Sequence, residues 1–267
     1  MHIRIGCELT YQSPVPTPML FIVRPREGER QRRLDEVRRV TPRIPVHEYV
    51  DAFGNRVWRL TAPAGEFRLT SDTLVEAPPT PDPWLPDLPG TAVAELPDHV
   101  IPYMHPSRYC PSDLLADEVG RLCGEAPEGW ARVQAICDWI HANINYAVGS
   151  DTATTAHDTF QQRQGVCRDF AHLAVAFCRC LNVPARYCTG YLGDMGETPP
   201  FGPMDFAAWF EAYLGGRWYT FDARNNTRRI GRVLIARGRD AADVAITTTF
   251  GPNTLESFRV WTDEVTG

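Results

Sequence analysis

One cysteine of the chain has the sequence setting of a catalytic nucleophile. Cys167 follows Gly165 and lies in the first turn of a helix that the apolar spacing predicts over about residues 166–181. The positive end of a helix dipole favours a thiolate, and the free backbone N–H groups of a first turn can bind an oxyanion. The alternative is one more buried cysteine, as we expect Cys178 and Cys180 to be, and position alone does not decide between the two.

A predicted β-hairpin about forty residues later could supply the partners of this thiol. Gly215-Gly216 forms a two-residue turn, which sets the register of the two strands. In that register position 207 and Asp222 are diagonal neighbours on one face, within reach of a long side chain. A histidine at position 207 would be oriented by Asp222 and could take the proton of Cys167. The residue there is Ala207, however, and the sequence has no histidine after His172.

The hairpin face that carries position 207 also carries an aromatic residue. Trp209 lies between position 207 and Glu211 on that face, so we predict that it lines a substrate groove beside Cys167. Ordinary packing of a strand aromatic is the alternative for Trp209. For Asp222 the alternative is a strand-end residue that opens a turn over residues 222–226.

The other histidines have no evident route to the thiol. His172 lies five residues after Cys167 on the same predicted helix and points to another side of it. His157 is expected in the loop before that helix, His141 near the end of the preceding helix, and His105 in a loop. The sequence therefore predicts a nucleophile and an acid without the base that would stand between them.

Composition excludes several other classes of function. The net charge of −6 gives no reason to expect nucleic acid or an anionic membrane as a partner, and all 27 basic residues are arginine. There is no phosphate loop, dinucleotide-binding fingerprint or Cys-x-x-Cys spacing, so we expect no cofactor and no metal. No apolar run is long enough to span a membrane, and the N-terminus lacks the apolar segment of a signal peptide. Eight cysteines outside a short disulfide scaffold predict a reducing compartment, which we take to be the cytoplasm.

The first hundred residues divide by composition into two parts. Residues 1–76 hold short runs of alternating apolar and polar residues between turn signals, which predict an N-terminal all-β, sandwich-like domain. Residues 77–100 contain seven prolines and predict an extended connector. The stretch 24–43 holds eight arginines among four acidic residues. We interpret it as a solvated loop of the β domain rather than as a site for an acidic partner.

Residues 101–267 predict a second domain. Ser112 is a candidate cap for a first helix, and a second helix is expected over about residues 129–143, before the one that starts near Cys167. Strands are expected at residues 185–192, in the hairpin, at 232–235 and at 257–262. Helices followed by antiparallel strands are typical of an α+β domain.

Three ordered motifs carry a family resemblance. They are Gly-Val-Cys-Arg-Asp-Phe-Ala-His at 165–172, Ala-Trp-Phe-Glu at 208–211 and Trp-Tyr-Thr-Phe-Asp at 218–222. Together they resemble the bacterial transglutaminase-like superfamily of cysteine-peptidase-like proteins. Residues 1–76 resemble the β domain that often precedes this core, so the resemblance covers nearly the whole chain.

The resemblance implies a papain-like α+β core, with helices packed on an antiparallel sheet and a triad of Cys, His and Asp. Cys167 matches the nucleophile, Asp222 matches the acid, and the family's histidine falls on Ala207. The implied reaction is acyl transfer at a carboxamide of a peptide or protein, through a thioester on Cys167 that water or an amine resolves. Loss of one general acid–base group typically costs ~10²–10⁴-fold, so we expect this chain to be inactive or strongly impaired.

Two explanations of Ala207 and two functions stay open. A single change to alanine in an otherwise complete site favours an engineered replacement over natural loss, because a site lost long ago should also have lost its acid. The alternative to a thiol acyl-transfer enzyme is a non-catalytic pseudoenzyme that binds a peptide in the groove around Cys167 and Trp209. The sequence does not choose between hydrolysis and amine transfer.

Overall fold

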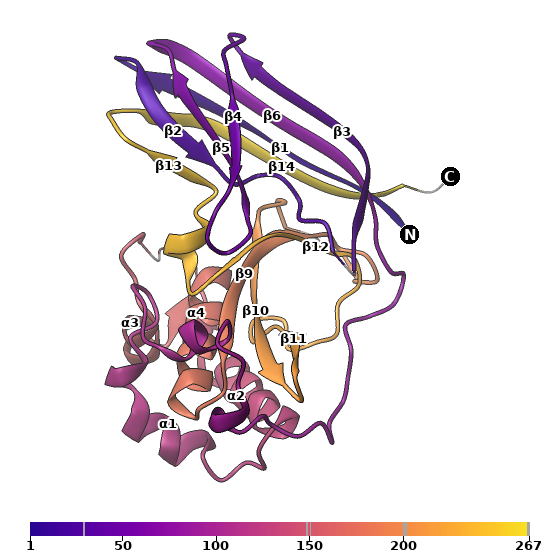
Figure 1. Ribbon diagram of the computed structural model, residues 1–267, viewed down its shortest axis with the longest axis vertical. Helices are drawn as coiled ribbons and strands as arrows, with labels where there is room; N and C mark the ends of the chain where they lie inside the picture. Colours follow the sequence, from indigo (N-terminus) through magenta and orange to yellow (C-terminus); the bar gives the residue numbers. More distant parts are fainter. Residues whose placement is uncertain (29, 148, 150, 200–201, 266–267) are drawn as a thin grey trace.

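Residues 1–28, 30–147, 149, 151–199 and 202–265 are described by the computed structural model. A β-rich part and a mixed part of helices and strands are stacked along the long axis of the molecule (Figure 1). The β-rich part holds two four-stranded antiparallel sheets, and the mixed part holds a third. The prediction of an α+β chain that begins with an all-β region is confirmed.

The two sheets of the β-rich part have the orders β14-β1-β6-β3 and β13-β2-β5-β4. The strands are β1 (His2–Ser13), β2 (Thr17–Phe21), β3 (Arg32–Thr41), β4 (His47–Val50), β5 (Arg56–Ala62), β6 (Gly65–Glu76), β13 (Thr247–Thr249) and β14 (Thr254–Val265). Alternate side chains of β1, such as Ile3 and Ile5, are fully buried, as the period of a strand requires. The rings of Phe21 in β2 and Phe67 in β6 lie 6.0 Å apart, so the two sheets share one core.

Strand β3 corrects the prediction of a solvated loop over residues 24–43. It forms the edge of the first sheet and pairs with β6. Its arginines and their neighbours are matched by carboxylates. Arg24 contacts Glu36 at 2.9 Å and Glu48 at 2.6 Å, and Arg33 contacts Glu36 at 3.1 Å. Charged pairs of this kind stabilise a strand and keep its free edge from pairing with another chain, so a high charge density is compatible with a strand here.

The C-terminal strand also lies elsewhere than the sequence suggested. Residues 257–262 form a strand as expected, but β14 pairs with β1 along its length, from His2 opposite Val265 to Gln12 opposite Thr254. The ring of Trp261 packs directly on Gly6 of β1. By its sheet pairing, the end of the described chain therefore belongs with residues 1–76 and not with the strands that precede it (Figure 1).

The sheet of the mixed part has the order β11-β10-β9-β12. Its strands are β9 (Ala185–Leu192), β10 (Ala207–Leu214), β11 (Arg217–Phe221) and β12 (Arg232–Gly238). The helices are α1 (Ala116–Cys123), α2 (Trp130–Asn143), α3 (Ala156–Gln162) and α4 (Cys167–Cys180), and a short parallel pair joins β7 (Asn145–Tyr146) to β8 (Gln164–Gly165). Short 3₁₀ turns are η1 (Val93–Glu95), η2 (Ile101–Met104), η3 (Ser112–Leu114) and η4 (Ala241–Val244).

The helix predictions hold for α2 and α4 and fail at two other places. Ser112 does not cap a helix, because it lies in η3 and α1 begins only at Ala116. The loop expected around His157 is helix α3. A capping box starts it, in which the backbone N–H of Asp158 donates to Thr155 Oγ1 at 3.2 Å and that of Thr155 donates to Asp158 Oδ2 at 2.9 Å.

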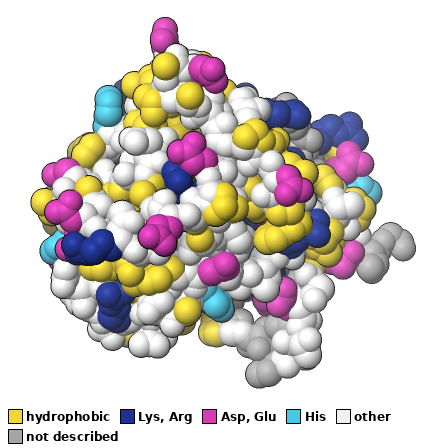
Figure 2. All heavy atoms as spheres, turned by 90° about the horizontal axis from the view of Figure 1, so that it is seen from below, with side chains coloured by type: hydrophobic (Ala, Val, Ile, Leu, Met, Phe, Trp, Pro, Cys, Tyr) yellow, Lys and Arg dark blue, Asp and Glu magenta, His cyan; other side chains and the backbone are white. Residues whose placement is uncertain are grey.

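Packing of α4 on β9 and β10 forms the second core and positions the site. Phe177 of α4 and Phe210 of β10 are fully buried in it. The hairpin register is as predicted, with Leu214 opposite Arg217 and Phe210 opposite Phe221. Within the described ranges, the helices are all too short or too polar to cross a membrane. Figure 2 shows acidic and basic side chains scattered over the face seen from below, without one patch of either sign.

Candidate active site

Cys167 lies at the N-terminal end of α4. Cys167 is its first residue, and Asp169 accepts a hydrogen bond from the N–H of Val166 at 2.9 Å, which closes the first turn. Asp169 is fully buried, and a Cβ on Gly165 would lie only 2.7 Å from its Cβ. The glycine is therefore needed for this close approach, and the motif around the cysteine is explained by local geometry.

A cavity of about 300 Å³ opens at the Cys167 thiol. Its walls come from the start of α4, the loop before β10, the start of β10 and the turn after β11. Cys167 and Ala207 both line it, as do Asp205, Arg224 and Asn225. The structure therefore brings together the predicted nucleophile and the position where its base would stand.

The electrostatic setting of Cys167 differs from the thiolate that the helix position suggested. Burial raises the pKa of the thiol, the charge of Arg224 acts in the opposite direction, and Asp205 adds to the rise. Their sum leaves the pKa above its ordinary value, so Cys167 is a neutral thiol at neutral pH. A proton acceptor is therefore needed before this sulfur can attack a carbonyl carbon.

Position 207 offers no such acceptor. Ala207 is the first residue of β10 and pairs with Gly190 of β9. None of the chain's seven histidines, all of which the structure describes, lines the cavity. His141 comes near it, since its Nδ1 lies 2.8 Å from the carbonyl oxygen of Arg224. His172 is fully buried between the rings of Tyr109 and Tyr187.

Asp222 is an ionised carboxylate that four hydrogen bonds hold in place. Its Oδ1 accepts from the backbone N–H groups of Arg224 at 3.1 Å and Asn225 at 3.0 Å. Its Oδ2 accepts from Asn225 Nδ2 and from Arg232 Nη2, each at 2.7 Å. Burial alone would raise the pKa of Asp222. The charge of Arg232 and the hydrogen bonds from Asn225 lower this pKa by more than burial raises it, so the net shift is downward. The same contacts show that Asp222 also opens the turn after β11.

Asn225 connects the acid with the cavity. Asp222 is not itself one of the described residues that line the Cys167 cavity, whereas Asn225 is, and its amide contacts the carboxylate. Cys167, Ala207 and Asn225 therefore share one cavity, and the amide of Asn225 contacts Asp222 from it. Sequence reasoning missed Asn225, Arg224 and Arg232. The turn Asp-Ala-Arg-Asn-Asn at 222–226 is the signal that could have indicated the first two.

Trp209 lies away from the predicted groove. Its side chain is 2% exposed and does not belong to the described lining of the Cys167 cavity. The guanidinium of Arg232 lies 5.1 Å from the centre of its ring, and the ring packs on Gly190. Trp209 faces a larger cavity on the side of the sheet opposite α4. Its register on the strand is as predicted, but both sides of this sheet are covered, so the side chain is buried.

The described residues offer no metal site, since no group of three or more His, Cys, Asp or Glu side chains in these ranges converges on one point. The eight cysteines are free thiols, and only Cys167 and Cys180 are not fully buried.

Comparison with known families gives two matches. The model of the transglutaminase-like superfamily matches residues 117–223, a range that includes Cys167, Ala207 and Asp222. The model of the bacterial transglutaminase-like N-terminal region matches residues 1–76. The two matched regions cover most of the mixed part and most of the β-rich part.

Relatives agree with this result over most of the chain. A crystal structure of a candidate cysteine protease from Cytophaga hutchinsonii is 38% identical, with a TM-score of 0.91, and the match covers 100% of this chain and 91% of that one. An uncharacterized protein of Mycobacterium leprae (strain TN) is 28% identical over 83% of this chain and 81% of its own length. An uncharacterized protein of Mycobacterium tuberculosis (strain ATCC 25618 / H37Rv) is 28% identical over 73% of this chain and 68% of its own.

Proposed function

Because the chain belongs to the transglutaminase-like superfamily, we propose that its site is that of a thiol acyl-transfer enzyme whose general base is absent. The observation that carries the proposal is the shared cavity. Cys167 and Ala207 line it together, and Asn225 connects it to a buried, ionised Asp222. In this proposal Cys167 is the nucleophile, Asp222 is the acid, and the methyl group of Ala207 stands where the base would be.

The proposed reaction starts at a carboxamide of a peptide or protein. Cys167 Sγ attacks the carbonyl carbon, and the developing oxyanion is stabilised by backbone N–H groups at the start of α4. The C–N bond breaks, the amine leaves with a proton, and a thioester remains on the sulfur. Water or a second amine then attacks the thioester carbon and releases the thiol, which regains its proton. Hydrolysis and amine transfer differ only in this last step.

Each proton transfer in this scheme calls for a general base, and none of the chain's histidines lines the cavity to supply it. A histidine at position 207 would take the thiol proton and deliver it to the leaving amine. Asp222 would hold the imidazole in the required tautomer, once its contact with Asn225 rearranged. With Ala207 instead, the thiol keeps a raised pKa, and the general acid–base contribution of ~10²–10⁴-fold is lost. We therefore propose that this chain turns over its substrate poorly or not at all.

The rate of alkylation of Cys167 by iodoacetamide, measured against pH, tests this proposal. The chain and its Ala207→His variant are compared, with Cys167→Ser as the background for other thiols. We expect the histidine variant to react much faster near neutral pH, because an imidazole beside the sulfur lowers its apparent pKa. Adding Asp222→Asn to the histidine variant should remove most of the gain, since the imidazole then loses its orienting acid.

If the alkylation rate of Cys167 depended on pH in the same way in the chain and in Ala207→His, the proposal would be contradicted. In that case position 207 is not the place of the base, and the cavity at Cys167 is better explained as a peptide-binding groove. A peptide complex that forms equally well in Cys167→Ser would support that alternative function.

A further inference from the structure

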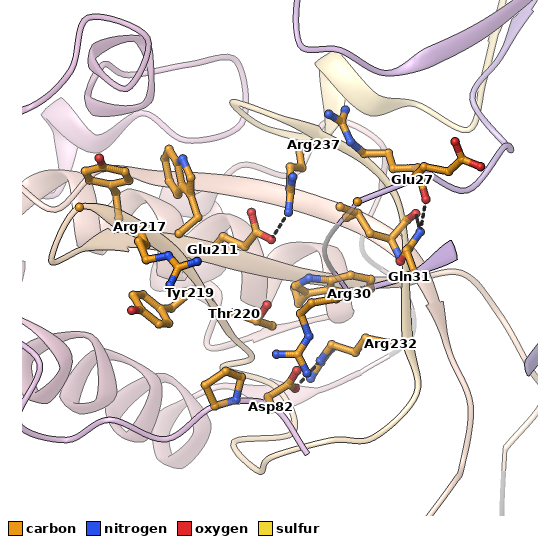
Figure 3. Close-up of a pocket in the computed structure, with 18 of the residues that line it drawn as sticks. Glu27, Arg30, Gln31, Asp82, Glu211, Arg217, Tyr219, Thr220, Arg232 and Arg237 are labelled. Atoms are coloured by element: carbon orange, nitrogen blue, oxygen red, sulfur yellow. Dashed lines mark hydrogen bonds and ion pairs between the residues drawn. The ribbon is translucent and has the colours of Figure 1, made fainter. Parts of the chain in front are cut away.

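The molecule has a second, larger cavity beside the sheet β11-β10-β9-β12, on the face opposite α4. Its volume is about 760 Å³, against about 300 Å³ for the cavity at Cys167. Figure 3 shows side chains from three parts of the chain reaching into it. Residues 26–28, 30 and 31 of the β-rich part form one wall, Asp82 and Pro83 of the connector form another, and strands β10, β11 and β12 form the floor. The cavity therefore exists only where these three parts meet.

The charges that line this cavity do not balance. Five arginines line it against three carboxylates: Arg26, Arg30, Arg217, Arg232 and Arg237 against Glu27, Asp82 and Glu211. Each carboxylate is already engaged. Glu27 accepts from Arg33 outside the cavity at 2.9 Å, Asp82 accepts from Arg232 at 2.8 Å, and Glu211 lies between Arg237 at 2.7 Å and Arg186 at 2.6 Å. The cavity is therefore left with an excess of positive charge.

Two of these arginines have no carboxylate among the contacts of the described residues. Arg26 donates to the carbonyl oxygen of Phe53 at 3.2 Å and to Asn55 Oδ1 at 2.8 Å, both of which are neutral acceptors. Burial and then repulsion by Arg237 and Arg186 lower its pKa, and the charge of Asp51 acts in the opposite direction. Arg30 is exposed at the rim and reaches into the cavity (Figure 3).

Arg232 supplies a buried donor that lacks a partner. Its side chain is only 7% exposed, its Nε contacts Asp82 and its Nη2 contacts Asp222. The third nitrogen, Nη1, is buried and makes no hydrogen bond in the described structure, and Nε of Arg237 is in the same state. An unpartnered buried donor is unfavourable, but neither nitrogen has accessible surface, so an acceptor in the cavity gains these hydrogen bonds only if the neighbouring side chains move.

Aromatic side chains line the remaining wall. Trp218 is half-buried, and the guanidinium of Arg186 lies 4.0 Å from the centre of its ring. Tyr219 points to the other face of β11, where its ring packs on Trp130. A flat apolar surface beside an arginine cluster is typical of sites that hold an organic molecule with an anionic group. We propose that this cavity binds a small organic anion. Its phosphate or carboxylate group contacts Arg26 and Arg30, the two arginines without a carboxylate contact in the described ranges, and its organic part packs on Trp218.

Binding can be followed by tryptophan fluorescence, because Trp209 and Trp218 both line the cavity. The chain is titrated with inorganic phosphate, pyrophosphate and citrate at constant ionic strength. We expect a saturable change with at least one of the three. Tighter binding of the phosphate compounds indicates a phosphorylated ligand, and tighter binding of citrate indicates a carboxylate. Loss of the signal in Trp218→Phe would place the binding site in this cavity.

Arg30→Gln is the decisive variant, with Arg43→Gln as its matched control. Both remove one charge from an exposed arginine, but Arg43 does not line the cavity. We expect Arg30→Gln to weaken binding by about tenfold or more, as the loss of one charge-assisted contact does, and Arg43→Gln to leave it unchanged. Equal effects of the two variants, or no saturable change with any of the anions, would overturn the proposal. The site does not involve Cys167, so this test is independent of the acyl-transfer proposal.

Discussion

Substitution of Glu211 should be among the most destabilising changes in the sheet β11-β10-β9-β12. Its carboxylate lies between two cations, with Oε2 2.6 Å from Arg186 Nε and Oε1 2.7 Å from Arg237 Nη2. The side chains are 7% exposed for Glu211, 12% for Arg186 and 28% for Arg237. Glu211→Gln keeps the size of the side chain and removes its charge, so both guanidinium groups remain buried or half-buried without a counter-ion.

The expected loss of stability follows from these exposures. Removing one partner of a buried ion pair costs about 3–5 kcal/mol, because the remaining charge stays out of water. Arg237 can be partly rehydrated, so we expect the lower end, about 3 kcal/mol. That is on the order of a hundredfold in the unfolding equilibrium. Denaturant unfolding, followed by tryptophan fluorescence, measures it. The control is Glu66→Gln, whose pair with Arg68 spans 3.3 Å between side chains that are 59% and 46% exposed, and which should cost under about 1 kcal/mol.

The pH dependence supplies a second check on Glu211. Burial alone would raise the pKa of its carboxyl, but the charges of Arg186 and Arg237 lower it more, so the folded protein has the lower pKa. The stabilisation is then fully present above the unfolded value of about 4.3 and is lost as the pH falls below it towards the folded pKa. The difference in free energy of unfolding between the unmodified chain and Glu211→Gln should therefore become smaller as the pH falls. A cost no larger than that of Glu66→Gln at neutral pH would refute this reasoning.

Three further predictions concern other parts of the molecule. Native protein should react with Ellman's reagent at no more than two thiols, Cys167 and Cys180, because the other six are buried; rapid reaction of more thiols would contradict the described packing. Gly190→Ala should cost at least about 1–3 kcal/mol in denaturant unfolding, as overpacking does, since the added Cβ would lie 2.6 Å from the ring of Trp209. Thr155→Ala removes the cap of α3 and should lower stability by about 1 kcal/mol, seen as a lower melting temperature; an unchanged melting temperature would mean that the cap contributes nothing.

Features set by neighbouring residues were predictable from the sequence. The two glycines at 215–216 give the hairpin register, and Gly165 followed by an apolar period of 3.6 gives the helix that presents Cys167. Position 207 and Cys167 could be placed together on that basis, with the help of the family resemblance. The capping box of α3 was also readable, although the polar composition of the segment obscured it.

Features set by distant residues were not predictable. Strand β3 depends on carboxylates that reach its arginines from other segments, such as Glu48 and Glu76, so its composition alone indicates a loop. The burial of Trp209 depends on Arg232 and on the wall that residues 26–28, 30 and 31 provide on the second face of the sheet. The hydrogen bond from Arg232 to Asp222 joins strand β12 to the turn that follows β11, and these two strands are not neighbours in the sheet. In each case the feature depends on a contact between residues that are distant in the sequence, so the local sequence does not predict it.

The pairing of β14 with β1 has a consequence for synthesis of the chain on the ribosome. Domains generally fold as units from the N-terminus while translation proceeds, but β1 lacks one of its two neighbours until residues up to 265 have been made. During that interval an edge with unpaired backbone groups is open to other nascent chains. A chain truncated before β14 would leave this edge of β1 permanently unpaired. We therefore expect chaperones and proteases to recognise such incomplete products, even though the region around Cys167 is complete.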